Sequence, residues 1–191
     1  QPCRKYKENY KRVHKAKERT PRYVKEVHVR LNFKLGFYAE FQADQYLALS
    51  HYTSAYAYLN QVKLAKDSER VIEVKLVAEL IAFKIIYLLL QMNRVDDAVK
   101  QFTDHIRFYR AFEGLASLSF HHYAWMAKQY RTFGEFYETA PAAVRSASRR
   151  QNPGFFYQAA AQHAAKRKAA AAAALKATGM FKLKPTVEGL P

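Results

Sequence analysis

Two adjacent histidines, His121 and His122, stand just before the only tryptophan of the chain, Trp125. The stretch LSFHHYAWMAKQYRTFGEF, residues 118–136, therefore holds side chains that could bind a metal beside an aromatic ring. Neighbouring residues of a helix point roughly 100° apart, so these two imidazoles cannot share one ion. We expect one histidine to be packed and the other to face solvent, with no metal bound.

The other residues that could do chemistry do not form a catalytic pattern. The six glycines are scattered, whereas a phosphate-binding loop needs them clustered. The single cysteine, Cys3, excludes an internal disulfide framework and a cysteine zinc cage. Asp96 and Asp97 are better explained as acidic residues in the first turn of a helix than as a catalytic dyad. We therefore predict a protein that is not an enzyme and that needs no cofactor.

The elements that must position these residues are helices. Among 191 residues there are only 6 Gly and 6 Pro, and apolar residues recur at helical spacing. The segment 68–92 is apolar around most of its circumference, so we expect it to be buried. Its most apolar run, residues 80–90, is too short for a membrane span, which needs roughly 20 residues. Three expected helices begin at Thr20-Pro21, Asp44 and Ser68. A fourth follows a turn at Asn93, has Asp96 and Asp97 in its first turn and ends by Gly114. Two more cover 118–131 and 135–150, with a kink or restart at Pro141, and a final helix runs from Asn152-Pro153 to Thr178-Gly179.

The segment KLGFYAEFQADQYLALSHYTSAYAYLN, residues 34–60, has the spacing of a helical hairpin. Small residues follow Leu35-Gly36 at helical intervals, and Tyr52 stands between two of them. This order resembles the tetratricopeptide pattern, in which small residues let two helices approach and an aromatic fills the gap. A weaker version of the pattern contains Ala98 and Phe102. We predict an all-α fold, an antiparallel helix-pair α-solenoid with degenerate tetratricopeptide-like repeats, over residues 20–178, with a basic extension at 1–19 and an irregular tail at 179–191.

The net charge of +16 is concentrated at the two ends of the chain. Residues 1–34 carry +9 and residues 145–191 carry +8, while residues 35–144 carry −1. Basic ends of this kind can bind an acidic protein surface, anionic lipid headgroups or nucleic acid; the alternative is that they are solvated and bind nothing. The tyrosine-rich middle is neutral, and this separation of aromatic from basic residues disfavours RNA binding. The candidate partner-facing or membrane-facing residues are Arg145, Arg149, Arg150, Lys166, Arg167 and Lys168.

A set of motifs in order gives the chain a family resemblance. GFYAEF, DDAVKQFTDHI, LSFHHYAWMAKQY, FGEFYETA and QNPGFFYQAAA, spread over residues 31–168, resemble the foie gras domain of TRAPP (transport protein particle) complexes. The resemblance implies a non-catalytic α-solenoid scaffold in a complex that tethers vesicles and exchanges nucleotide on Rab-family GTPases. It also implies a role in ER-to-Golgi transport and autophagy, with other TRAPP subunits as partners. The resemblance further implies that Trp125 packs into the neighbouring helix pair and that Gly134 lies at or just after the bend that follows the helix of His121 and His122.

The same resemblance implies a cytoplasmic protein that is peripheral on cis-Golgi and ER–Golgi intermediate membranes. The alternative function is a basic helical-repeat module that binds nucleic acid or an anionic membrane. No small-molecule substrate is expected for either of these two functions.

Overall fold

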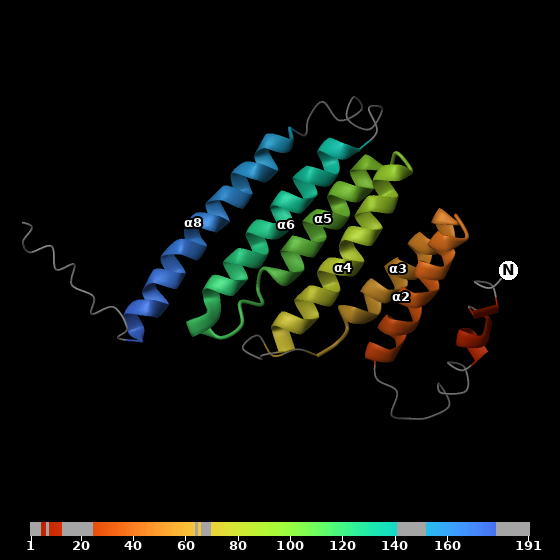
Figure 1. Ribbon diagram of the computed structural model, residues 1–191, viewed down its shortest axis with the longest axis horizontal. Coiled ribbons are helices and arrows are strands. Elements are labelled where there is room, and N and C mark those ends of the chain that lie inside the picture. Colours follow the sequence, from red (N-terminus) through yellow and green to blue (C-terminus); the bar gives the residue numbers. More distant parts are fainter. Residues whose placement is uncertain are drawn as a thin grey trace, which may run out of the picture.

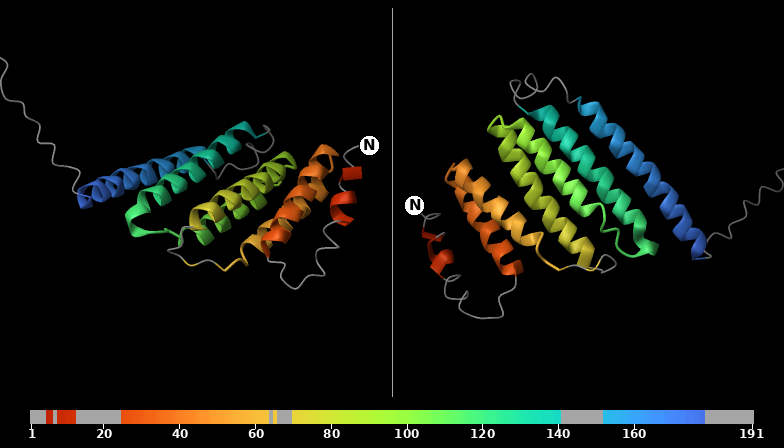
Figure 2. Two further views of the ribbon diagram at one scale, coloured as in Figure 1. Left: turned by 60° about the horizontal axis from the view of Figure 1, so that its bottom comes forward. Right: turned by 180° about the vertical axis from the view of Figure 1, so that it is seen from behind.

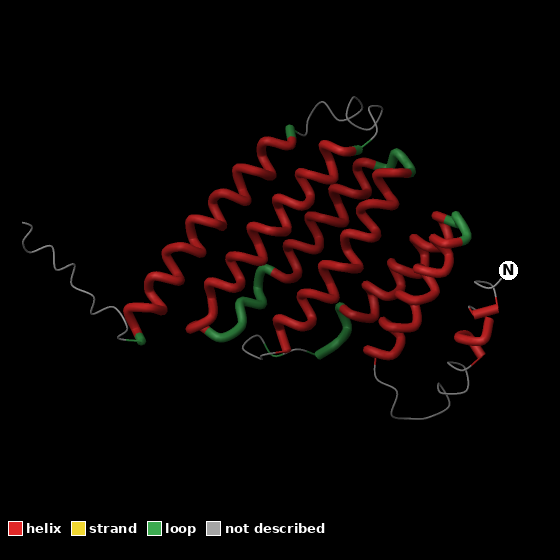
Figure 3. The backbone as a smooth tube through the Cα atoms, viewed as in Figure 1, coloured by secondary structure: helices red, strands yellow, loops and turns green. Residues whose placement is uncertain are grey.

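The structure is a computed structural model that describes residues 5–6, 8–12, 25–63, 65, 70–140 and 152–178. Every regular element in these residues is a helix, which confirms the predicted all-α class (Figure 3). No described helix is long and apolar enough to cross a membrane. The elements are α2 (Lys25–Phe41), α3 (Gln45–Leu59), α4 (Arg70–Gln91), α5 (Val95–Tyr109), the 3₁₀ helix η1 (Ala116–Leu118), α6 (Ser119–Thr139) and α8 (Pro153–Ala177).

The helices lie side by side in chain order, from α2 at one end to α8 at the other (Figures 1 and 2). Three antiparallel pairs can be followed along the array: α2 with α3, α4 with α5, and α6 with α8. Between the pairs, α3 packs on α4, and α4 and α5 both contact α6. A single apolar core runs through these interfaces.

Several helix boundaries follow from local chemistry that the sequence predicts. The carboxylate of Asp44 accepts a hydrogen bond from the Leu47 amide (3.0 Å) at the start of α3. Asn152 accepts one from the Gly154 amide (2.8 Å), and Pro153 follows at the first position of α8. Asn93 forms the turn before α5 with a positive φ of 59°. The start signals at Thr20-Pro21 and Ser68 lie outside the described residues, as does Pro141.

The first hairpin is packed as its sequence pattern predicts. Ala39, Ala48, Tyr52 and Ala55 are all completely buried between α2 and α3. The Tyr52 ring fills the space left by Gly36, and a Cβ placed on that glycine would lie 2.8 Å from Cε1 of the ring. The small residues therefore let the two helices come close, with one aromatic ring between them.

Three predictions about the later helices are wrong. Residues 118–131 and 135–150 were expected as two helices, but α6 continues without a break to Thr139 and Gly134 lies inside it. Gly134 serves packing, because a Cβ there would lie 3.1 Å from the Tyr157 ring of α8. The helix expected over 68–92 is not wholly buried, since α4 leaves Leu76 and Leu80 more than half exposed. α5 also ends at Tyr109, before the stop predicted at Gly114.

The packing of Gly36 against Tyr52 generates a stability prediction. Alanine normally stabilises a helix by about 1 kcal/mol relative to glycine. At position 36 the added methyl must displace a fully buried ring, which costs about 1–3 kcal/mol and outweighs that gain. Urea unfolding of Gly36→Ala should therefore show a net loss of stability, while Thr53→Ala on the exposed side of α3 should change it by less than about 0.5 kcal/mol. A Gly36→Ala protein as stable as the parent would contradict this packing.

Candidate functional site

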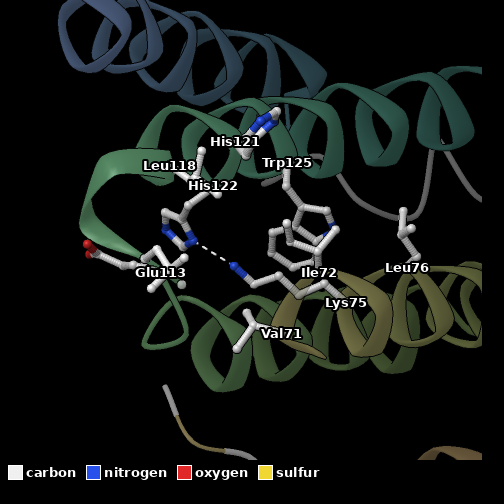
Figure 4. A pocket seen from close by; sticks show the side chains of 11 residues that line it. Val71, Ile72, Lys75, Leu76, Glu113, Leu118, His121, His122 and Trp125 are labelled. Carbon is white, nitrogen blue, oxygen red and sulfur yellow. Dashed lines mark hydrogen bonds between the residues drawn. The ribbon is translucent and has the colours of Figure 1, made fainter. Parts of the chain in front are cut away.

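A lysine and a histidine meet in the interior between α4 and α6. Lys75 is only 4% exposed, and its Nζ donates a hydrogen bond to Nδ1 of His122 (2.7 Å; Figure 4). Lys75 is buried because it shares the inner face of α4 with Val71 and Ala78, four residues before it and three after it. His122 is 5% exposed on α6. The pair therefore places a polar contact in the buried interface between α4 and α6.

Trp125 completes the surroundings of the lysine. The Nζ of Lys75 lies 4.9 Å from the centre of the Trp125 ring, at cation–π distance. Beside this group is a pocket of about 190 Å³ with mostly apolar walls, to which Ile72, Leu76 and Leu118 contribute. Glu113 also lines the pocket, but Figure 4 shows its carboxylate pointing away from the ammonium.

Burial sets the charge state of this pair. It lowers the pKa of Lys75 to about 8, with the Glu113 charge opposing the change. Burial and the nearby Lys75 charge lower the pKa of His122 to about 4, although a hydrogen bond to the backbone of Phe112 acts in the other direction. At neutral pH, Lys75 is therefore a buried cation held by a neutral imidazole. Such a cation is expensive to desolvate, and in the described part of the chain it forms no ion pair with a carboxylate.

A second buried polar group lies directly behind Trp125. The Trp125 ring packs against His105 of α5, with ring centres 5.4 Å apart. His105 is completely buried, and its Nδ1 lies 2.7 Å from the Tyr56 hydroxyl of α3. Its Nε2 lies 3.2 Å from Oε1 of Gln129 on α6, and the Gln129 amide nitrogen donates to Glu79 of α4 (2.7 Å). We call Tyr56, His105, Gln129 and Glu79 the polar chain; it connects α3, α5, α6 and α4.

The direction of each hydrogen bond in the polar chain follows from its end at Glu79. The Glu79 carboxylate accepts from the Gln129 amide nitrogen and forms an ion pair with Lys128. The amide oxygen of Gln129 then faces His105, so Nε2 carries a proton and donates to it. Burial lowers the pKa of His105 to about 4, so the imidazole is neutral and its Nδ1 accepts from the Tyr56 hydroxyl.

Comparison with known proteins identifies the family. The family described as "Foie gras liver health family 1" matches residues 70–186, which is more than half of the chain. The chain belongs to the foie gras family. It is 37% identical over 128 residues to trafficking protein particle complex subunit 11 of Homo sapiens, and 36% identical to the proteins of that name in Bos taurus and Gallus gallus. These matches cover 67% of the chain but 11% of each relative, so it corresponds to about a tenth of their length.

The histidine pair of this foie gras chain divides as its helical position predicts. His122 is packed against α4, whereas His121 is exposed and points away from it (Figure 4). Trp125 packs against His105 and Tyr109 of the preceding helix pair, which confirms its predicted role. Among the residues that the structure describes, no group of three His, Cys, Asp or Glu side chains is arranged to hold a metal ion.

The predicted basic residues fall into two groups. Lys166, Arg167 and Lys168 are exposed on α8, which carries no acidic residue. Three consecutive helical residues spread over more than half of the helix circumference, so they do not form one compact patch. Arg167 shares a shallow groove between α6 and α8 with Lys128 and Arg131. Arg145, Arg149 and Arg150 lie outside the described residues.

The residues that the sequence analysis missed are the buried polar ones. They lie on the core-facing side of their helices, which the apolar residues around them define: Lys75, Glu79, His105 and Gln129. A signal was present: Lys75 follows Val71 at i+4, and His105 lies between Phe102 and Tyr109 on the same stripe of α5. A charged or polar residue at such a position indicates a buried pair, but its partner comes from another helix and cannot be identified from spacing.

The lowered pKa values of His105 and His122 predict acid sensitivity. Both histidines have a usual pKa of 6.5 and a folded-state pKa of about 4, so between these pH values the unfolded chain binds more protons. The contribution of each neutral imidazole to stability is therefore complete above about pH 6.5 and is lost as the pH falls toward 4. Each adds a slope of up to about 1.4 kcal/mol per pH unit.

Urea unfolding between pH 7 and pH 5 tests this dependence. Replacing His122 with Gln keeps an acceptor for Lys75 but removes one titrating group, so the free energy of unfolding should depend less steeply on pH. The matched variant His121→Gln, at the exposed neighbour, should keep the slope of the parent. Equal slopes for His122→Gln and the parent would show that His122 does not titrate as described.

Proposed function

We propose that this chain is part of a non-catalytic arm subunit of a TRAPP complex, which tethers vesicles and exchanges nucleotide on Rab-family GTPases. The observation that carries the proposal is the 36–37% identity to trafficking protein particle complex subunit 11 over two thirds of the chain. The role is structural: the chain provides surface for other TRAPP subunits in ER-to-Golgi transport and autophagy. In this proposal, Rab-family GTPases bind to the core of the complex and not to this segment.

The proposed architecture is an α-solenoid of degenerate tetratricopeptide-like repeats over residues 20–178, flanked by the basic extension 1–19 and the tail 179–191. Its support is the succession of antiparallel pairs, each in contact with its neighbours in the array. The buried small residues of the first pair have a counterpart in Ala98, which is completely buried, followed by the buried Phe102. Repeat arrays of this kind offer extended faces to partners.

The proposed location is the cytoplasmic face of cis-Golgi and ER–Golgi intermediate membranes, where the protein is peripheral. Lys166, Arg167 and Lys168 support an anionic contact because they are exposed and have no acidic neighbour on α8. Arg145, Arg149 and Arg150 are proposed to add to this charge. The partner in this contact is either an acidic protein or anionic lipid headgroups, and the second experiment below distinguishes these two partners.

The first experiment tests membership of the complex. The tagged full chain should co-purify with TRAPP subunits from cells, and the association should persist in high salt because it rests on packed protein surfaces. Binding to nucleic acid would instead weaken steeply as salt is raised, through counterion release. A gel shift with RNA and DNA is therefore run in parallel. Nucleic-acid binding without TRAPP subunits would overturn the proposal.

The second experiment tests the basic end. Reversing Lys166, Arg167 and Lys168 to Glu should reduce flotation with phosphatidylserine liposomes by about tenfold or more, since each cation that faces an anionic surface contributes about 1 kcal/mol and not all three can face it at once. A matched control reverses Lys63, Lys100 and Arg110, which are exposed in the neutral middle of the chain. Loss of complex assembly with unchanged flotation would indicate an acidic protein partner. A folded variant that floats and assembles like the parent would show that these residues are merely solvated.

A further inference from the structure

The outer side of α4 carries an exposed apolar ridge. Ile72, Leu76 and Leu80 follow one another every four residues and are 46%, 54% and 52% exposed. Residues at this spacing form a continuous row along a helix. A contiguous exposed row of large aliphatic side chains usually marks an interface with another molecule. We call these three residues the α4 ridge.

Two hollows flank the α4 ridge. Ile72 and Leu76 line the pocket beside Lys75, between α4 and α6. Leu80 lines a second, apolar hollow of about 380 Å³ between α4 and α2, with Val29 and Phe33 on its other wall. A raised row of side chains between two hollows matches the way helices pack, because the side chains of one helix enter the spaces between those of the other.

Lys75 gives this apolar surface a specific chemical requirement. Within the described residues its only hydrogen-bond partner is the neutral imidazole of His122, which leaves two of its three N–H groups without an acceptor. The indole N–H of Trp125, in the same pocket lining, is also buried and has no acceptor there. A buried cation and a buried donor at one pocket call for an anionic acceptor, and a carboxylate is the one that proteins supply.

The size and charge of the pocket favour a protein side chain over other anions. Its volume of about 190 Å³ exceeds what the few heavy atoms of a carboxylate side chain occupy. Glu113 lines this pocket, and in the neighbouring hollow Arg30 and Arg70 are matched by Glu26 and Glu73, so the surface as a whole is not cationic. A membrane or a nucleic acid would bring many negative charges to a surface without net positive charge, whereas a single Asp or Glu among aliphatic residues needs only one buried cation.

We propose that the α4 ridge and the Lys75 pocket form the docking site for a helical segment of another TRAPP subunit. This segment places the carboxylate of an Asp or Glu on Lys75 and aliphatic side chains on Ile72, Leu76 and Leu80. The proposal rests on the proposed function and specifies the partner surface. The carboxylate converts a costly buried cation into a paired one, so it adds specificity to the apolar contact.

The test uses the full chain assembled with the TRAPP subunits, with the photo-crosslinking residue p-benzoylphenylalanine at position 76. Irradiation followed by mass spectrometry should identify one segment of another subunit with an Asp or Glu among aliphatic residues. The same crosslinker at Leu175, which is 42% exposed on α8, is the matched control and should not link to that segment. Co-purification of the subunits is measured on the same samples.

Two variants test the chemistry of the contact. Lys75→Met keeps an apolar stem and removes the buried charge, so it should leave the fold intact and reduce the crosslink at position 76 about tenfold, as expected for a lost charge-assisted hydrogen bond. Leu80→Glu changes only an exposed position and should reduce the crosslink similarly, whereas Leu175→Glu should not. Circular dichroism confirms that each variant is folded.

Each remaining outcome has a defined meaning. A segment without an acidic residue, or a crosslink that neither Lys75→Met nor Leu80→Glu reduces, overturns the proposed docking site. Crosslinks only to a second copy of the chain overturn it in favour of self-association. An assembled complex in which position 76 links to nothing refutes the docking site but leaves the proposed function standing. Failure of the parent chain to co-purify with the subunits refutes both.

Discussion

His105 can satisfy both of its ring nitrogens only when two other helices supply their partners at the correct distance. The ring is completely buried, so a missing partner would leave a polar atom without water or protein to bond. Tyr56 of α3 and Gln129 of α6 fill these positions, and Gln129 is itself fixed by Glu79 of α4. Apolar contacts tolerate small shifts of one helix along another, but this directional chain does not. The arrangement of the middle four helices therefore depends on one neutral imidazole.

The same constraint determines what the candidate site can do. His105 supports one side of Trp125, and the Trp125 ring in turn lies beside the Lys75 ammonium. The lysine is thus held in place before any partner arrives, which reduces the ordering cost of binding. A fixed, buried cation beside an exposed apolar ridge is suited to recognition of a protein surface.

The sequence predicted those features that depend on neighbours along the chain. Asp44 and Asn152 cap helices as expected, because a cap involves only the next few residues. The packing of Tyr52 among small residues was also predictable, since a hairpin brings a known spacing together. The break expected near Gly134 was wrong because Tyr157, from the next long helix, gives that glycine a packing role. The exposure of Leu76 and Leu80 could not be predicted either, since apolar content alone does not distinguish a core face from a binding face.

The most direct test of this account is a cryo-electron microscopy map of the assembled complex that contains the full chain. We predict that α3, α4, α5 and α6 keep their arrangement and that the outer side of α4 is covered by another subunit, with a carboxylate within hydrogen-bond distance of the Lys75 Nζ. A map in which this side of α4 faces solvent would contradict the account.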